Sequence, residues 1–252
     1  MTVAHKLHLV DGDSEATTST RTVTRMARHE VRLRDEARLR VAKKPLYSGK
    51  EDPDDSSTWA PAVWLVGAHG GAGVTTLSNM LAPFGDASQQ WPSHDTHPWC
   101  VVVARENYSG LAAAQQVVLQ AATGQSGDCT VLGVITVADG PGKRPKKLTS
   151  SLRVIEEISP VWRIGWIPEL KVTASNELAT WKPGDTVPKK RRRRSITETV
   201  PREVQEIATE ILQLAAENHA AATTETIPTV NDDDVATTND NAAAAEEEKE
   251  EE

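Results

Sequence analysis

Apolar residues concentrate in the middle of the chain, roughly 60–182, whereas both ends are polar and charge-biased. Four short runs in this middle region are mainly apolar. The first, 62–67, is continuously apolar, which is typical of a parallel strand covered on both faces. These predicted strands are 62–67, 100–105, 130–138 and 161–167. Helices are predicted between them over 74–82, 110–122 (with Ser109 as N-cap) and 148–158. The alternation predicts an α/β domain: a small, shortened parallel sheet with helices on both faces.

The flanking composition predicts four further segments around this domain. The predicted organisation is an N-terminal arm and linker (1–58), the α/β domain (59–182), a basic linker (183–200), a C-terminal helix (201–218) and an acidic tail (219–252). Residues 1–20 of the arm and the tail are expected to be disordered because few apolar residues could form a core there. Within the arm, 21–44 carries a ragged helical stripe that ends at Pro45. It is interpreted either as a solvated helix or as a contact for nucleic acid or an acidic membrane.

The net charge of −8 conceals two basic stretches, 21–44 and 189–194. The tail 219–252 holds eleven acids and one lysine, so the rest of the chain has a net charge of +2. Six adjacent cations predict a solvated arm that binds polyanions, including nucleic acid, or alternatively pairs with the acidic tail. They are Lys189, Lys190, Arg191, Arg192, Arg193 and Arg194.

No apolar run approaches the roughly 18 residues that a membrane span needs, and the N-terminus lacks the apolar segment of a signal peptide. The two cysteines lie in or beside predicted core strands, which favours buried thiols in a reducing compartment. A cytoplasmic location is therefore expected.

A glycine-rich turn joins the first predicted strand to the first helix. It reads Ala68, His69, Gly70, Gly71, Ala72, Gly73, Val74, Thr75, Thr76. Glycines let backbone N–H groups turn toward an anion, and a following helix N-terminus adds partial positive charge. Against the P-loop pattern G-x-x-x-x-G-K-[ST], Ala68 replaces the first glycine and Val74 the lysine.

The turn resembles the deviant Walker loop, G-K-G-G-x-G-K-T-T, of the ParA/MinD partition and positioning ATPases. His69 stands at the signature lysine, which in that family reaches across a dimer, and Val74 stands at the lysine that holds the β/γ-phosphates. Only the Mg²⁺-binding threonine role carries over, onto Thr75, so the resemblance implies the fold more strongly than the activity. The cofactor that it implies is ATP or ADP with Mg²⁺. His69 is interpreted as a neutral stand-in for lysine or as a turn residue that tolerates an unusual φ.

Later segments also resemble a MinD-like domain, at 101–111, 132–139 and 162–168. That family's switch II strand, which ends in an acid that positions Mg²⁺ and water, should precede Cys100. No apolar strand ending in such an acid is recognised there, because Asp86 and Asp95 lie in polar surroundings. Residues 60–170 also resemble an uncharacterised group of ParA-like proteins from actinobacteria and their mobile elements.

Lys143 and Arg144 follow the third strand at its carboxyl end, the edge at which open parallel sheets bind ligands. They are expected either to supply the charge that Val74 cannot or to lie in a solvated loop. The function predicted is a non-hydrolysing nucleotide-binding, phosphate-binding or regulatory protein, a pseudo-ATPase linked to maintenance or transfer of bacterial plasmid or mobile-element DNA. The alternatives are an active ATPase that uses substitute residues and a protein-interaction scaffold with a relic P-loop, either self-associating or binding a protein partner.

Overall fold

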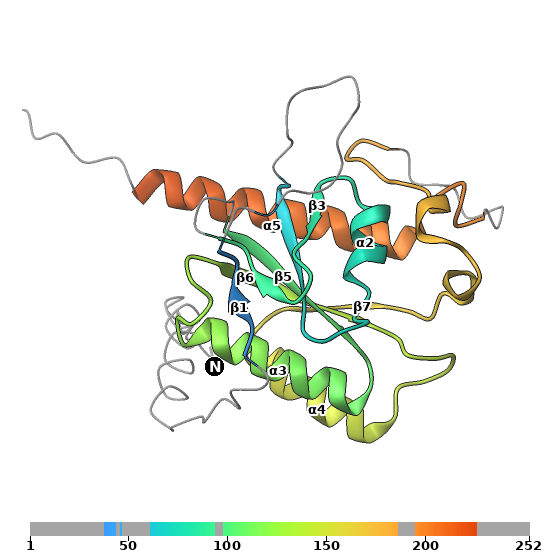
Figure 1. Ribbon diagram of the computed structural model, residues 1–252, viewed down its shortest axis with the longest axis horizontal. Coiled ribbons are helices and arrows are strands. Elements are labelled where there is room, and N and C mark those ends of the chain that lie inside the picture. The colour runs from blue at the N-terminus through green and yellow to red at the C-terminus, as the bar shows by residue number, and fades with distance from the viewer. Residues whose placement is uncertain (1–37, 44–45, 47–60, 94–97, 186–194, 226–252) are drawn as a thin grey trace, which may run out of the picture. The chain divides into compact units, whose positions relative to one another are not determined.

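The computed structural model describes residues 38–43, 46, 61–93, 98–185 and 195–225. Its main sheet has five strands, all parallel to their neighbours, in the order β3-β2-β5-β6-β7 (Figure 1). The strands are β3 (Phe84–Asp86), β2 (Val63–Gly67), β5 (Trp99–Arg105), β6 (Thr130–Val137) and β7 (Val161–Ile164). The predicted α/β class with a small parallel sheet is confirmed.

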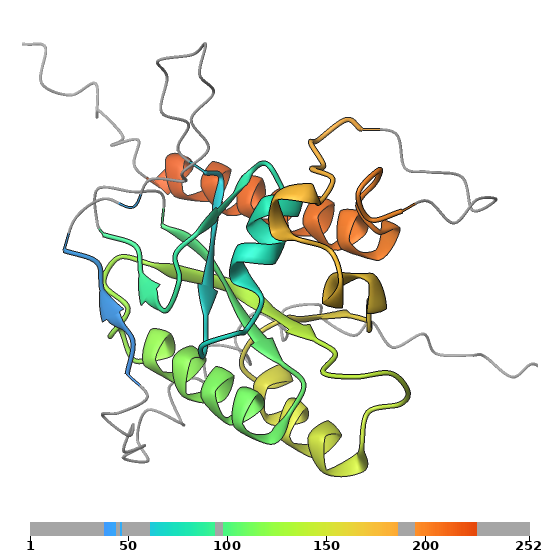
Figure 2. The ribbon, with the colours of Figure 1, turned by 45° about the vertical axis from the view of Figure 1, so that its right-hand side comes forward.

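Helices cover both faces of this sheet. Along β2, Val63 and Leu65 pack with residues of α2 (Val74–Met80) and α5 (Arg202–Glu225), whereas Trp64 and Val66 pack with residues of α3 (Tyr108–Ala122) and α4 (Lys146–Glu156). Helices α3 and α4 lie side by side below the sheet in both ribbon views (Figures 1 and 2). This two-sided burial explains the continuously apolar sequence of β2, since both of its faces need apolar side chains.

Two short strands lie where no regular structure was predicted. Phe84–Asp86 forms β3 at one edge of the main sheet, and β4 (Gln90–Trp91) pairs with β1 (Arg40–Val41). The prediction missed β3 because it has three residues and a central glycine, a residue depleted in strands. The glycine is required by packing: a Cβ at Gly85 would lie 2.6 Å from the Trp64 ring.

Several predicted boundaries are corrected. Helix α3 begins at Tyr108, and its N-cap is Asn107, whose side chain accepts a hydrogen bond from the Gly110 N–H at 2.8 Å, so Ser109 is not the cap. Helix α4 begins two residues earlier than predicted, and β7 ends at Ile164, followed by the 3₁₀ turns Pro168–Lys171 and Ser175–Glu177. Helix α5 extends to Glu225, and the second compact unit of the chain begins inside it, at Ala216.

The predicted flanking segments are described only in part. Arg40–Val41 is a strand, so the helix expected over 21–44 is wrong at its C-terminal end, and 21–37 lies outside the described residues. The six cations 189–194 and most of the acidic tail also lie outside them. Ile196 and Val200 are buried in the core, so 195–200 belongs to the domain rather than to a linker. Among the described helices, none is both long and apolar enough to cross a bilayer.

Candidate phosphate-binding site

The glycine-rich turn has the backbone geometry that its sequence predicts. Gly71 and Gly73 have φ values of 76° and 104°, in the left-handed region that glycine adopts without a steric penalty. Two N–H groups are used inside the fold: Ala68 donates to the Val103 carbonyl at 2.9 Å and Ala72 to the His69 carbonyl at 3.3 Å. Helix α2 has only seven residues, so the turn's own amides, more than a long helix dipole, would hold an anion here.

Thr75 faces a carboxylate. Its Oγ1 donates a hydrogen bond of 2.6 Å to Asp86 Oδ2, and Asp86 is the last residue of β3, the strand beside β2. The expectation that no strand ends in an acid before Cys100 is therefore wrong. That strand is β3, too short and too polar to be recognised in the sequence.

The Asp86 carboxylate is held in place by the turn that follows it. The Ser88 N–H donates to Asp86 Oδ1 at 2.6 Å, and Ser88 has a φ of 54°. It is the one non-glycine residue with positive φ among the described residues, and such backbone strain often occurs at functional sites. Across the described part of the chain no group of three or more His, Cys, Asp or Glu residues could hold a metal ion. A hydroxyl and one carboxylate still fit Mg²⁺, which keeps several waters and uses ligand phosphates.

His69 has a structural role that neither interpretation anticipated. Its Nε2 accepts a hydrogen bond of 3.1 Å from the Arg105 backbone N–H, so the ring proton is on Nδ1, which donates to the Gly70 carbonyl at 2.9 Å. Both nitrogens are engaged within the fold, and neither is left to replace a lysine at a phosphate. The φ of His69 is not positive, so the interpretation of His69 as a turn residue with an unusual φ is also wrong. It joins the turn to the end of β5.

Arg105 is a cation that contacts the turn, and the sequence analysis did not single it out. Its Nε donates to the Gly71 carbonyl at 2.9 Å, and its Nη1 forms an ion pair of 3.1 Å with Asp139 Oδ1. Asp139 also accepts from Asn107 Nδ2 at 3.4 Å. The bonds from Arg105, and then from Asn107, lower the pKa of Asp139 below its ordinary value.

The glycine-rich turn, Asp86 and Arg105 line a hollow of about 360 Å³, which we call the glycine hollow. It brings together every predicted loop residue except Ala68. Five further residues line it: Gly67, Asp86, Ser88, Gln89 and the cation Arg105. Val74 lines it with an apolar side chain that is largely buried. Lys143 and Arg144 do not line it, so the charge that they were expected to supply is not found there.

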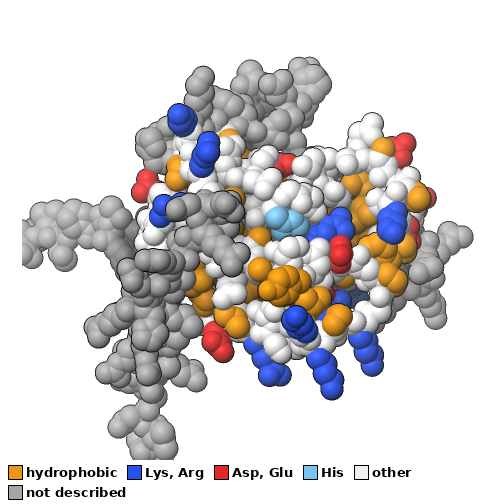
Figure 3. Space-filling view, turned by 60° about the horizontal axis from the view of Figure 1, so that its bottom comes forward, with side chains coloured by type: hydrophobic (Ala, Val, Ile, Leu, Met, Phe, Trp, Pro, Cys, Tyr) orange, Lys and Arg blue, Asp and Glu red, His pale blue; other side chains and the backbone are white. Residues whose placement is uncertain are grey.

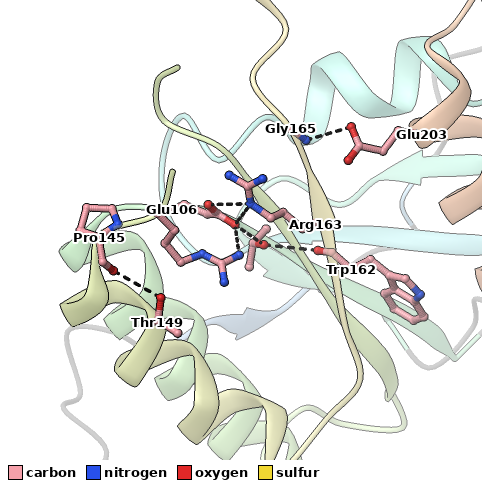
Figure 4. Close-up of polar contacts among 9 residues, drawn as sticks. Glu106, Pro145, Thr149, Trp162, Arg163, Gly165 and Glu203 are labelled. Carbon is pink, nitrogen blue, oxygen red and sulfur yellow. Dashed lines mark hydrogen bonds and ion pairs between the residues drawn. The ribbon is translucent and has the colours of Figure 1, made fainter. Parts of the chain in front are cut away.

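Lys143 and Arg144 instead line a second hollow, of about 570 Å³, at the carboxyl ends of β5 and β6. On its lining, the buried Glu106 carboxylate accepts hydrogen bonds from Arg144 Nη2 at 2.5 Å, Arg163 Nε at 2.9 Å and Thr136 Oγ1 at 2.9 Å (Figure 4). Burial by itself raises the pKa of Glu106, but the bonds from Arg144, Thr136 and Arg163 outweigh it, and the pKa is lowered.

The two hollows share a wall. Arg105 lines the glycine hollow, and its partner Asp139 lines the second one. Three charged groups in this region, Asp86, Arg105 and Glu106, were missed as site residues. The signal that could have found them is their position, because each lies at or just after the carboxyl end of a strand.

Residues 61–192, more than half of the chain, match the model of a family described as a family of unknown function (DUF6668). No curated protein matches the chain. No solved structure matches it either.

Proposed function

The chain belongs to DUF6668, a family of unknown function, and we propose that it binds a Mg²⁺–nucleotide or phosphate at the glycine hollow as a regulatory protein, with little or no hydrolysis. The observation that carries this proposal is the 2.6 Å hydrogen bond from Thr75 to Asp86 beside a glycine-rich turn. The turn's amides would hold phosphate oxygens, and the hydroxyl and carboxylate would hold the metal. Bound Mg²⁺ would neutralise phosphate charge.

The absence of a lysine argues against efficient hydrolysis. Val74 stands where the resemblance to ParA/MinD proteins expects the cation that grips the terminal phosphates, and its side chain is apolar. Arg105 is a cation on the same hollow, but its guanidinium is already bonded to Gly71 and Asp139. Phosphoryl transfer depends on charge stabilisation in the transition state, so its loss slows catalysis far more than binding.

The biological setting in this proposal rests on the resemblance alone. It is maintenance or transfer of bacterial plasmid or mobile-element DNA, with nucleic acid or a protein as partner. The sequence feature that supports a polyanionic partner is the run of six cations at 189–194.

An active ATPase remains the second candidate because Asp86 and Arg105 line the same hollow. Release of inorganic phosphate from Mg-ATP distinguishes the two. Turnover above background that disappears in Thr75→Ala would establish the ATPase, whereas binding without turnover is expected.

Thermal unfolding tests the proposal, with Mg-ATP, Mg-ADP or inorganic phosphate, each with and without EDTA. A ligand at a hundred times its Kd adds about 2.7 kcal/mol, which raises Tm by roughly 2–4 °C per kcal/mol in a domain of this size. Asp86→Asn is expected to lose the EDTA-sensitive part of the shift. Asp128→Asn, which removes the same charge from an exposed loop, should retain it. If none of the three ligands raised Tm, the proposal would be contradicted, and the glycine-rich turn would have a structural role only.

A further inference from the structure

The second hollow carries an excess of positive charge. Its volume of about 570 Å³ lies within the roughly 300–1,000 Å³ typical of small-molecule sites. The charged side chains that line it are four cations, Lys143, Arg144, Lys147 and Arg163, and two carboxylates, Glu106 and Asp139. Because Asp139 is paired with Arg105 on the shared wall, Glu106 is the carboxylate left to balance all four cations.

Glu106 balances only part of that charge. Its single carboxylate is shared by the guanidinium groups of Arg144 and Arg163 (Figure 4). The Arg163 side chain is 40% exposed while it makes this contact, so part of its guanidinium can reach a ligand. Arg144 keeps a buried Nε–H with no acceptor among the described residues. The cations of the hollow therefore carry more positive charge than the Glu106 carboxylate neutralises, so the hollow can accept a further anionic group.

The rim adds two lysines and an aromatic ring. Lys143 and Lys147 are exposed, and within the described residues neither has an acidic partner. The Lys147 ammonium lies 5.3 Å from the ring centroid of Tyr108, whose side chain is unusually exposed, at 67%. This contact holds a cation beside an open aromatic surface. Lysine and arginine side chains project along the lower border of the space-filling view (Figure 3).

We propose that the second hollow is a separate binding site for a small organic phosphate. The phosphate group contacts Lys143, Lys147 and Arg163, and an aromatic or apolar part of the ligand lies against Tyr108. A phosphate suits this set because it accepts several charge-assisted hydrogen bonds at once. The site is distinct from the phosphate site proposed at the glycine turn, because Thr75 and Asp86 do not line this hollow.

Isothermal titration with phenyl phosphate tests the proposal, since this probe joins a phosphate to one aromatic ring. The full chain is titrated at low salt as wild type, as Thr75→Ala and as the double variant Lys143→Ser/Lys147→Ser. Equal binding by wild type and Thr75→Ala, and at least tenfold weaker binding by the double variant, is expected. Lys171→Ser/Lys182→Ser, which removes two exposed lysines elsewhere, is the matched control and should bind like the wild type.

Three outcomes would overturn the proposal. They are no binding by the wild type, loss of binding in Thr75→Ala, and equal binding by the two double-lysine variants. Loss in Thr75→Ala would place the probe in the glycine hollow and would support the function proposed there instead. Competition by inorganic pyrophosphate that weakens as salt is raised would support the charge-based recognition argued above.

Discussion

Gln120 holds the backbone of Leu39 through both ends of its side-chain amide. Its Oε1 accepts from the Leu39 N–H at 3.0 Å, and its Nε2 donates to the Leu39 carbonyl at 2.7 Å. Gln120 is buried in α3, and it lies 81 positions after Leu39 in the sequence. These two hydrogen bonds help to hold β1 in place, since its strand pairing within the described residues is with the two residues of β4 alone.

Gln120→Leu should release residues 38–43 without unfolding the domain. The two bonds to Leu39 contribute roughly 1–3 kcal/mol of local stability, because each contributes about 0.5–1.5 kcal/mol. The variant also loses the bond from Gln120 Nε2 to the Gln125 carbonyl, within the same part of the fold as α3. Limited digestion with trypsin measures the effect, since Arg38 and Arg40 lie in this segment. Cleavage there should accelerate in Gln120→Leu but not in Gln115→Leu, the half-buried control on the same helix. Equal cleavage rates would mean that the amide does not anchor the strand.

Arg105→Met should weaken phosphate binding at the glycine hollow while leaving the fold nearly unchanged. The ion pair with Asp139 is partly exposed, so its contribution to stability is about 0–1 kcal/mol. Titration of the Asp139 carboxyl by NMR gives a second measurement. Its pKa is lowered in the wild type, so it should rise toward the ordinary value in Arg105→Met. An unchanged pKa would show that the guanidinium does not hold this carboxylate in solution.

Glu106→Gln should destabilise the protein at neutral pH by about 1.5–3 kcal/mol, the usual contribution of hydrogen bonds to charged groups. The folded pKa of Glu106 is lowered, so its stabilisation is present above the unfolded value of about 4.3 and is lost as pH falls through the folded pKa. Urea unfolding at pH 7 and near pH 3 should therefore show a difference between wild type and variant that shrinks in acid. Glu157→Gln, an exposed control, should show little difference at either pH.

Val74→Lys should strengthen phosphate binding. A lysine can keep its stem along the apolar wall that Val74 now occupies and extend its ammonium into the hollow. One charge-assisted bond is worth about 1.5–3 kcal/mol, or about tenfold or more in affinity, at a cost of about 1–3 kcal/mol in core packing. Titration with Mg-ADP at low salt measures the gain, and Val172→Lys, at a residue that is 87% exposed, is the control. A gain equal to that of the control would indicate a general charge effect.

Four strands of the sheet could be predicted because they are four to eight residues long and mainly apolar. The edge strand β3 could not, since three residues with a central glycine give no periodic signal. That miss removed Asp86 from the predicted site. The partners of His69 and Arg105 were also beyond prediction, because they depend on which strand ends meet, and sequence alone does not give the order β3-β2-β5-β6-β7.

One guanidinium lies between the two hollows: Arg105 lines the glycine hollow, and its ion-pair partner Asp139 lines the second. Arg105 touches the glycine turn through Nε and Asp139 through Nη1. If both proposed sites bind, a ligand that draws this group toward the glycine turn would change the charge around Asp139, and occupancy of the two hollows would be thermodynamically linked. Such linkage is reciprocal: the factor by which the first ligand changes the affinity for the second equals the factor in the opposite direction. In that case a single side chain would couple two ligand sites at the carboxyl edge of one small sheet.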